Sequence, residues 1–451
     1  MNIFQKSDAL YLLAFFLILI GIGTVLLMIP AAWHGMPPDA SGVAGPAARL
    51  SIIDALFIAT SAICVTGLST LNIAAFSRFG HVIILGLIQI GGLGIISFTS
   101  ILMTIPGHRF AISRRNTIQG FYLDGMEYNP RRIVRNIVVF TLIIEATGAL
   151  LLCLVFLSAG IEDWLFMGIF HGVSAFCNAG FSPFAEGLSG FTTHTPLLLI
   201  LMGLIIAGGL GFIVLHDMLR VFLKRKTRLS YHSRVVLSMT AGLILGGALL
   251  FFLIERNRLY SNMDTLSAIT NAFFQSVTTR TAGFEIWPQT NLSQPSKLLT
   301  DLLMLIGGAP GSIAGGLKVT TIFVIVIVMM RKPDEYGDIK ISHHRLNADT
   351  INKGVVYFLK AIALLLVCIA ALSVTEWHSG VDFGAIIFEN FSAFATVGLS
   401  LGLTPALSTP GKLVIILAMF AGRVGLIALA FPAMGHKNYD ITYPEGSILL
   451  G

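Results

Sequence analysis

Eight long apolar runs divide this chain, and each is followed by a polar or mixed segment. Such a run needs roughly 18 residues to be interpreted as a bilayer span. We therefore predict eight spans. They fall near residues 9–30, 79–105, 133–159, 194–222, 233–254, 298–330, 354–376 and 411–433.

Shorter apolar segments lie between alternate pairs of these runs. They cover 51–66, 164–179, 264–282 and 382–397, and each ends near a glycine. An apolar stretch too short to cross a bilayer is typical of a re-entrant segment. The pattern predicts an all-α membrane protein with four tandem helix–pore-loop–helix repeats around a central ion pathway. The predicted repeats are 1–106, 107–222, 223–340 and 341–451, the last with a C-terminal tail.

The glycine that ends each short segment recurs at near-equal spacing. The four turns are Val65-Thr66-Gly67, Asn178-Ala179-Gly180, Thr281-Ala282-Gly283 and Thr396-Val397-Gly398. A second glycine-rich series, in the second run of each repeat, has the same period: Gly91-Gly92-Leu93-Gly94, Gly208-Gly209-Leu210-Gly211, Gly315-Gly316-Leu317-Lys318 and Gly422-Arg423-Val424-Gly425. Two features with one period indicate four copies of one unit, although packing through small residues also accounts for the second series.

Composition and charge support a membrane protein. Hydrophobic residues make up 55% of the 451 residues and charged residues 12%, against about 25% charged in soluble domains. The net charge of +6 comes from basic residues between the runs, in 107–135, 219–234 and 331–353, which does not favour nucleic-acid binding. Basic loops stay cytoplasmic. We therefore expect a multi-pass protein of the bacterial cytoplasmic membrane with both termini in the cytoplasm.

The four glycine turns suggest a site for a dehydrated cation. Glycine permits left-handed backbone, and inward carbonyl oxygens replace the hydration shell of an ion in K⁺ channels. Thr396-Val397-Gly398 matches the core of such a filter. No metalloprotease motif, Asp-rich metal motif or nucleophile elbow is present, so we do not expect an enzyme. The four cysteines form no CxxC pair, and no covalently bound cofactor is expected.

The second run of the third repeat is interrupted. Residues 307–316 contain one proline and five glycines, which cannot form a continuous helix. Exposed to lipid, such a break would leave backbone groups unsatisfied, so we expect it to face the pathway. Arg423, inside the last apolar run, is costly there and marks a functional site by default.

In these turns and in the interrupted run, the chain resembles the K⁺ transporters of the Trk, Ktr and HKT superfamily, most closely KtrB-type membrane subunits. The resemblance covers nearly the whole chain. It implies K⁺ uptake, homodimerisation in the bilayer and a cytosolic KtrA-type RCK ring that binds ATP or ADP. It also implies that glycine in all four turns goes with K⁺ selectivity.

The resemblance further implies an intramembrane gate. Its residues would be Arg423 with Gly308, Ala309, Pro310, Gly311, Ser312, Gly315 and Gly316. The arginine would repel cations and pair with loop carbonyls or a carboxylate. For three other charged residues the roles stay open: Arg280 could pin the third turn, Glu145 could pair with a polar group or relay protons, and Lys318 has no assigned role.

Other readings remain. A secondary cation transporter of the alternating-access type would also place glycine breaks at mid-membrane, although its repeats are often inverted. Channel-like passage, activation by Na⁺ and coupling to H⁺ would all use this architecture. Asp54 and Asp264, at the starts of the first and third short helices, are expected to act as N-caps.

Overall fold

The computed structural model describes residues 3–35, 50–102, 130–224, 227–335, 337–341 and 344–425. Its helices fall into four groups in chain order, and we use group 1 to group 4 as names for them. Group 1 contains α1 (Ile3–Leu27), α2 (Ile52–Cys64) and α3 (Arg78–Leu102). Group 2 contains α5 (Pro130–Ser158), α6 (Trp164–Phe176), α7 (Thr195–Leu210) and α8 (Phe212–Phe222).

Groups 3 and 4 follow the same order. Group 3 contains α9 (Tyr231–Glu255), α10 (Thr265–Thr278), α11 (Gln294–Leu305) and α12 (Val319–Met330). Group 4 contains α13 (Ala348–Thr375), α14 (Phe383–Ala395), α15 (Thr409–Phe420) and a π-helical turn, Ala421–Gly425. Short 3₁₀ turns occupy Pro30–Ala32, Ile73–Ala75, Ser189–Phe191, Gln289–Asn291 and Thr404–Ala406.

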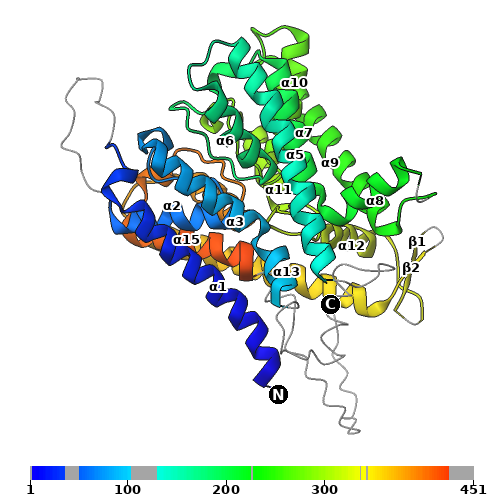
Figure 1. The fold of residues 1–451 in the computed structure, drawn as a ribbon. Helices are drawn as coiled ribbons and strands as arrows, with labels where there is room; N and C mark the ends of the chain where they lie inside the picture. Colours follow the sequence, from blue (N-terminus) through cyan, green and yellow to red (C-terminus); the bar gives the residue numbers. More distant parts are fainter. Residues whose placement is uncertain are drawn as a thin grey trace.

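The expectation of a purely helical chain is wrong in one place. Strands β1 (Ile339–Ile341) and β2 (His344–Leu346) pair antiparallel, with Ile339 opposite Leu346. The hairpin lies beyond the end of α12, at the edge of the molecule (Figure 1). The stacked rings of Tyr231 and His344, 4.1 Å apart, link it to the start of α9.

The described residues account for part of the eight predicted spans. Among the described residues, three helices are long and apolar enough to cross a membrane: Arg135–Ser158, Tyr231–Glu255 and Ala348–Thr375. A fourth span requires α7 and α8 to be taken together, but they are bent by 105° at Gly211. The predicted run 298–330 is divided between α11 and α12.

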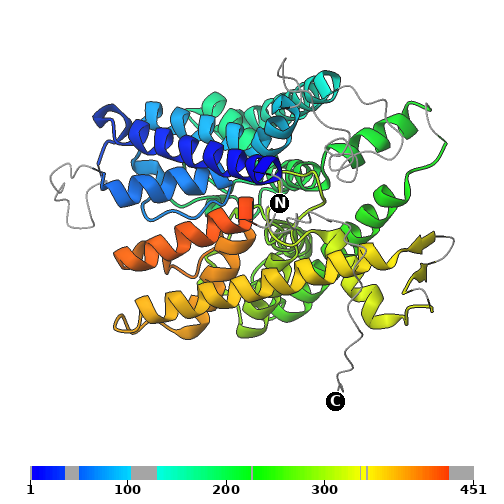
Figure 2. The same ribbon diagram turned by 90° about the horizontal axis from the view of Figure 1, so that it is seen from below.

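The four groups contact one another in a closed ring. In each case the helix after the turn packs against the short helix of the next group: α3 on α6, α7 on α10, α11 on α14, and α15 on α2. The helices of groups 1 and 4 therefore lie side by side although they are at opposite ends of the chain (Figures 1 and 2). An ion pair between Asp54 of α2 and Lys412 of α15, at 2.8 Å, joins these two groups.

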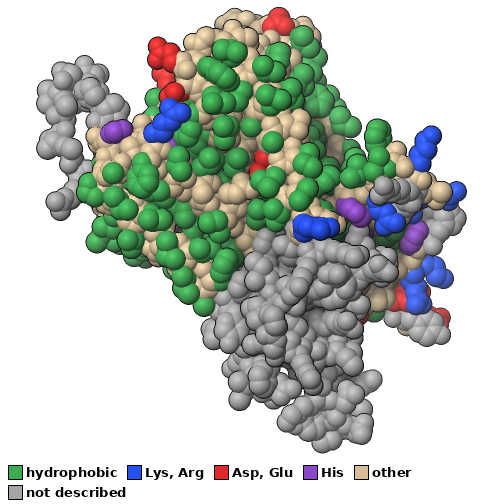
Figure 3. Space-filling model, in the orientation of Figure 1, with side chains coloured by type: hydrophobic (Ala, Val, Ile, Leu, Met, Phe, Trp, Pro, Cys, Tyr) green, Lys and Arg blue, Asp and Glu red, His purple; other side chains and the backbone are tan. Residues whose placement is uncertain are grey.

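Burial separates the short helices from the long ones. Most side chains of α2, α6, α10 and α14 are buried. By contrast, α5 exposes Leu142, Leu150 and Leu154, each more than half accessible. Hydrophobic side chains cover much of the visible face (Figure 3). Such an apolar exterior suits contact with lipid, whereas a soluble protein rarely exposes so large an apolar patch.

Side-chain caps fix where the helices start. Asp264 caps α10 as predicted, and hydrogen bonds from Ser267 lower the pKa of this exposed carboxyl group. The prediction for α2 was wrong, because Ser51 is the N-cap and Asp54 lies three residues later. Ser51 donates to the Asp54 carboxylate at 2.6 Å, so the two residues form a local capping arrangement like a capping box.

Candidate functional site

Each predicted glycine turn follows directly after a short helix and has the same alternating backbone. The residue two before the glycine and the glycine itself both have positive φ, while the residue between them does not. The left-handed pairs are Val65 and Gly67, Asn178 and Gly180, Thr281 and Gly283, and Thr396 and Gly398. A non-glycine residue in this region is uncommon. Finding one at the same place in all four turns therefore indicates a shared, constrained geometry.

The four turns also touch one another in sequence. A methyl group added to Gly67 would lie under 3.0 Å from the carbonyl oxygen of Ala179 in the next turn. The same holds for Gly180 with Ala282, Gly283 with Val397, and Gly398 with Thr66. Each glycine thus abuts the carbonyl oxygen that precedes the next glycine. The last contact returns from group 4 to group 1 and closes a ring.

Hydroxyl groups on the short helices hold these turns in place. Ser61 and Ser392 accept hydrogen bonds from the amides of Gly67 and Gly398, at 3.1 and 3.0 Å. In the other two groups, Ser174 and Thr278 donate to the carbonyls of Phe181 and Phe284, at 2.9 and 2.8 Å. These four anchors were not predicted from the sequence. Their hydroxyls lie five or six residues before each turn glycine, and that signal could have found them.

Two of the turns are also linked by side chains. The amide group of Asn178 and the hydroxyl of Thr281 lie 3.2 Å apart. The best orientation of the Asn178 amide lets its nitrogen donate to the carbonyls of Ala175 and Ile205 while its oxygen accepts from Thr281. Asn178 therefore braces its turn from behind. In the described part of the chain, the buried hydroxyls of Thr66 and Thr396 have no hydrogen-bond partner.

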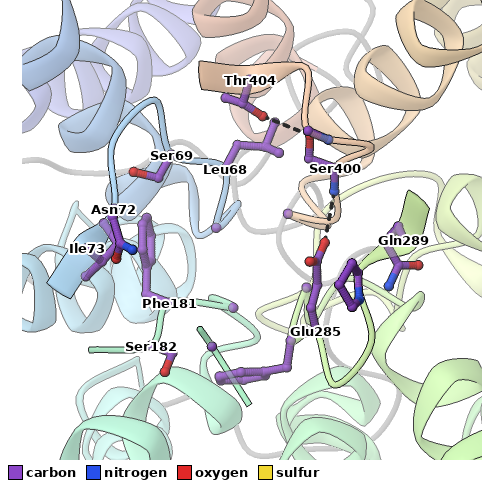
Figure 4. Close-up of a pocket in the computed structure, with 18 of the residues that line it drawn as sticks. Leu68, Ser69, Asn72, Ile73, Phe181, Ser182, Glu285, Gln289, Ser400 and Thr404 are labelled. Atoms are coloured by element: carbon purple, nitrogen blue, oxygen red, sulfur yellow. Dashed lines mark hydrogen bonds between the residues drawn. The ribbon is translucent and has the colours of Figure 1, made fainter. Parts of the chain in front are cut away.

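A cavity opens on one side of the ring. Its volume is about 480 Å³, and all four turn glycines line it. Polar residues from the loops after the turns line it, among them Ser69, Ser182, Glu285 and Ser400 (Figure 4). Water can therefore reach one side of the carbonyl ring. We call this space the outer cavity.

The other side of the ring is closed by two broken helices that complete each other. The carbonyls of Gly208 and Gly209, at the end of α7, would be left without helical partners. The amides of Ile313 and Ala309, in the interrupted segment, donate to them at 3.4 and 2.9 Å. The backbone groups exposed by one break are thus satisfied by the other, which low-polarity surroundings require.

The residues predicted to form a gate lie in this interrupted segment. Gly311 packs against Gly211 at the bend between α7 and α8, and Gly315 packs against the side chain of Thr396. Gly311 and Gly316 have positive φ. The Ser312 hydroxyl donates to the Ala309 carbonyl at 2.6 Å. Pro310 is half-buried between them, and Gly308 approaches the Gly209 carbonyl.

Three basic side chains donate to carbonyls of the interrupted segment. Arg423 binds the carbonyls of Ile313 and, at 3.1 Å, Gly91 of α3. Arg280 donates to Gly307 at 3.2 Å and Lys318 to Ala314 at 2.6 Å. Arginine and lysine carry donors only, so each can neutralise carbonyl dipoles that would otherwise attract a passing cation. The structure thus places a partner on Arg280 and Lys318, whose roles the sequence left open.

Glu145 lies behind the second turn. Its carboxylate accepts from Gln89 at 3.1 Å and contacts the Cys177 thiol at 3.6 Å. The structure therefore gives Glu145 polar partners on α3 and at the end of α6. All four cysteines are free and buried. Among the described residues, no group of three or more His, Cys, Asp or Glu side chains could hold a metal ion.

These features define a class of protein. Carbonyl oxygens at a ring of strained turns, embedded among apolar helices and reached by water from one side, are the arrangement by which membrane proteins pass dehydrated cations. The fold and the ring of turns are therefore typical of a membrane cation transporter.

Comparison with known proteins identifies the family. A family model described as TrkH, cation transport protein, matches residues 12–437. The chain is 40% identical to the potassium/sodium uptake protein NtpJ of Enterococcus hirae, over 88% of this chain and 90% of that protein. It is 36% identical to the Ktr system potassium uptake protein B of Vibrio alginolyticus, over 89% of each chain.

A solved structure agrees with the sequence comparisons. The crystal structure of the potassium transporter TrkH from Vibrio parahaemolyticus matches with a TM-score of 0.72 at 20% identity, over 94% of this chain and 84% of that chain. The chain belongs to the TrkH family of cation transport proteins. The resemblance to Trk and Ktr proteins is confirmed, and so is the prediction of a transporter rather than an enzyme, because the relatives are transporters.

Proposed function

We propose that this protein takes up K⁺ across the bacterial cytoplasmic membrane through the ring of four turns. The observation that carries the proposal is the closed series of contacts from each glycine to the next turn's carbonyl. Four similar carbonyls per layer suit a dehydrated monovalent ion, which is bound without a full opposing charge. The helices before the turns add the negative ends of their dipoles. K⁺ is then the transported ion, and its ligands are the carbonyls of the twelve turn residues.

The interrupted segment and Arg423 would form the barrier on the side away from the outer cavity. Three observations support this. The segment closes the ring on that side, basic side chains occupy its carbonyls, and its glycines permit a second backbone conformation. Transport would then require this segment to move away from α7.

Regulation and assembly form the second part of the proposal. Two relatives, from Vibrio alginolyticus and Bacillus subtilis, are named as component B of a Ktr system. We propose that this chain likewise forms a homodimer and docks a cytosolic nucleotide-binding ring through its basic loops, with both termini in the cytoplasm. The C-terminal tail of the fourth repeat lies outside the described residues.

The deciding experiment is uptake in cells that lack their own K⁺ transport. The parent chain is expected to restore growth at low K⁺ and to take up K⁺ and Rb⁺ in preference to Na⁺. In the same cells, Gly67→Ser should lose the K⁺ preference, because a side chain there meets the Ala179 carbonyl. Equal discrimination by parent and variant would remove the filter assignment at that turn.

Alternating access is the second candidate, and one observation favours it. Broken helices at mid-membrane are typical of secondary transporters, and α7 and α11 both end at breaks. Currents in reconstituted vesicles separate the two candidates. Passive flow through the ring predicts a current that reverses at the K⁺ equilibrium potential, whereas ion-coupled transport predicts a reversal that depends on the Na⁺ or H⁺ gradient. Na⁺ added at equal concentration on both sides tests activation alone.

A further inference from the structure

The four turns are alike up to the glycine but differ two residues beyond it. At that position stand Ser69, Ser182, Glu285 and Ser400. All four line the outer cavity (Figure 4). Groups 1, 2 and 4 thus supply a serine at this position, whereas group 3 supplies a carboxylate. Glu285 is the only ionisable side chain that the described residues contribute to the cavity lining.

The backbone and side chain of Glu285 are held from two sides. Its carbonyl accepts a hydrogen bond from the Leu188 amide of group 2, at 3.2 Å. One carboxylate oxygen accepts from the Ser400 amide of group 4, also at 3.2 Å. The side chain is therefore directed across the cavity, above the ring, rather than away into solvent (Figure 4).

A second carboxylate lies behind Ser400. Glu389 of α14 is fully buried and accepts hydrogen bonds from the hydroxyls of Ser400, at 2.7 Å, and Thr404. Ser400 thus separates the two carboxylates. Within the described part of the chain, neither of them forms an ion pair with a basic residue. No basic side chain of the described residues therefore neutralises a negative charge on Glu285, and the low-dielectric walls of a cavity concentrate the potential of such a charge.

We propose that Glu285, supported by Glu389, binds a monovalent cation in the outer cavity and sets the apparent affinity for the transported ion. This inference rests on the proposed function and adds a site to it, outside the ring of carbonyls. A cation held there would keep part of its hydration shell beside the single carboxylate. One charge offers attraction without the tight binding that would slow entry into the ring.

The test is the concentration dependence of K⁺ uptake in Glu285→Gln. Glutamine keeps the shape and an oxygen that accepts from the Ser400 amide, so only the charge is removed. We expect the KM for K⁺ to rise about three- to tenfold while Vmax stays within about twofold. Glu285→Asp, which keeps the charge, should have a KM closer to the parent value than Glu285→Gln has.

Glu186→Gln is the matched control. It removes one negative charge from the same side of the molecule, but its side chain is exposed and does not line the cavity. Its KM should equal that of the parent. The shift in Glu285→Gln should also persist at high ionic strength, since screening weakens long-range surface attraction more than binding at a partly buried site.

Three results would overturn the inference. They are an unchanged KM in Glu285→Gln, an equal rise in Glu186→Gln, or a joint loss of Vmax and K⁺ preference, which would make Glu285 a brace for the fourth turn. A parent chain without K⁺-selective uptake would instead overturn the proposed function. The two failures are therefore distinguishable in one set of strains.

Discussion

The two sides of the carbonyl ring differ in symmetry. Toward the outer cavity, the four groups repeat the same turn, with the same pair of left-handed residues and the same contact to the next turn. On the opposite side, among the described residues, the helices of groups 2 and 3 are broken, and their breaks fit each other. Group 1 continues through Gly91 as helix α3, and group 4 contributes Arg423.

This difference distinguishes a feature that all four groups must share, the turn, from a feature that one group can supply alone, the barrier. In the proposed function, an ion at the centre needs similar oxygens from all sides, so every group adopts the same strained turn. A barrier needs only one movable segment, and four independent ones would have to open together. We therefore expect substitutions in the turns to change which ion passes, and substitutions on the opposite side to change how fast it passes.

Gly398→Ala should give the largest effect. A side chain there meets the Thr66 carbonyl, and its φ of 99° is strained for any L-residue. We expect K⁺ uptake to fall about 100-fold or more, because removing well-placed electrostatic groups costs about 3–4 kcal/mol. Gly402→Ala is the control, since Gly402 also has positive φ but has open space around it. Equal losses would mean that strain alone, rather than the ring contact, decides the effect.

Gly211→Ala probes the bend between α7 and α8. The added methyl group would press on the backbone of Gly311 and Ser312 at 3.0 Å, and φ is 77°. We expect a change in K⁺ flux of about tenfold, in line with about 1–2 kcal/mol of left-handed strain, with an unchanged K⁺ to Na⁺ ratio. Gly203→Ala, on α7 with nothing within 4 Å, should behave as the parent. An altered ion preference in Gly211→Ala would contradict the division between the two sides.

Arg423→Gln should raise K⁺ flux a few-fold and loosen its control. It removes a charge and two charge-assisted hydrogen bonds to Ile313 and Gly91, each contributing about 1.5–3 kcal/mol. Part of that loss is offset by the glutamine amide. Arg423→Lys keeps the charge but reaches fewer carbonyls, so its K⁺ flux should lie between those of the parent and Arg423→Gln. Tracer efflux from vesicles measures the effect, and an Arg423→Gln flux equal to the parent's would remove the residue from the barrier.

The ion pair that joins groups 1 and 4 should give the smallest effect. Asp54 and Lys412 are 14% and 17% exposed, so we expect a coupling of about 0.5–1.5 kcal/mol. Thermal unfolding in detergent of Asp54→Asn, Lys412→Gln and the double variant gives this value. The exposed pair Asp349 and Lys353 is the control and should couple by about 0.5 kcal/mol or less. Equal coupling in the two pairs would show that partial burial does not strengthen the link between groups 1 and 4.

The sequence located the four glycine turns because a glycine recurs after each short apolar segment, and each of these glycines has positive φ. Glycine adopts left-handed backbone more readily than other residues, so a repeated glycine after a short apolar segment indicates such a turn from the sequence alone. The bend at Gly211 could not be predicted in the same way. Apolar residues flank it on both sides, so the hydropathy pattern runs through it unchanged, and Gly208 and Gly209 have an equally good explanation in helix packing.

Contacts between side chains and backbone carbonyls were the second feature that the sequence could not predict. The sequence marked Arg423 because a charge inside an apolar run is costly, but which carbonyls it binds depends on how groups 1, 3 and 4 pack. The same applies to Arg280 and Lys318. Ser61, Ser174, Thr278 and Ser392 were overlooked because a hydroxyl near the end of a helix is common and carries no signal unless it is compared across the four copies.

All four turns belong to one polypeptide, and this has a consequence for how such a ring can diversify. In an assembly of four identical subunits, one substitution changes all four equivalent positions at once. Here a change in one codon alters only one of the four equivalent positions above the ring, so three of them can be serine and one glutamate. The electric field above the ring can therefore be asymmetric while the backbone of the ring stays nearly fourfold symmetric. A tetramer of identical subunits cannot combine the two.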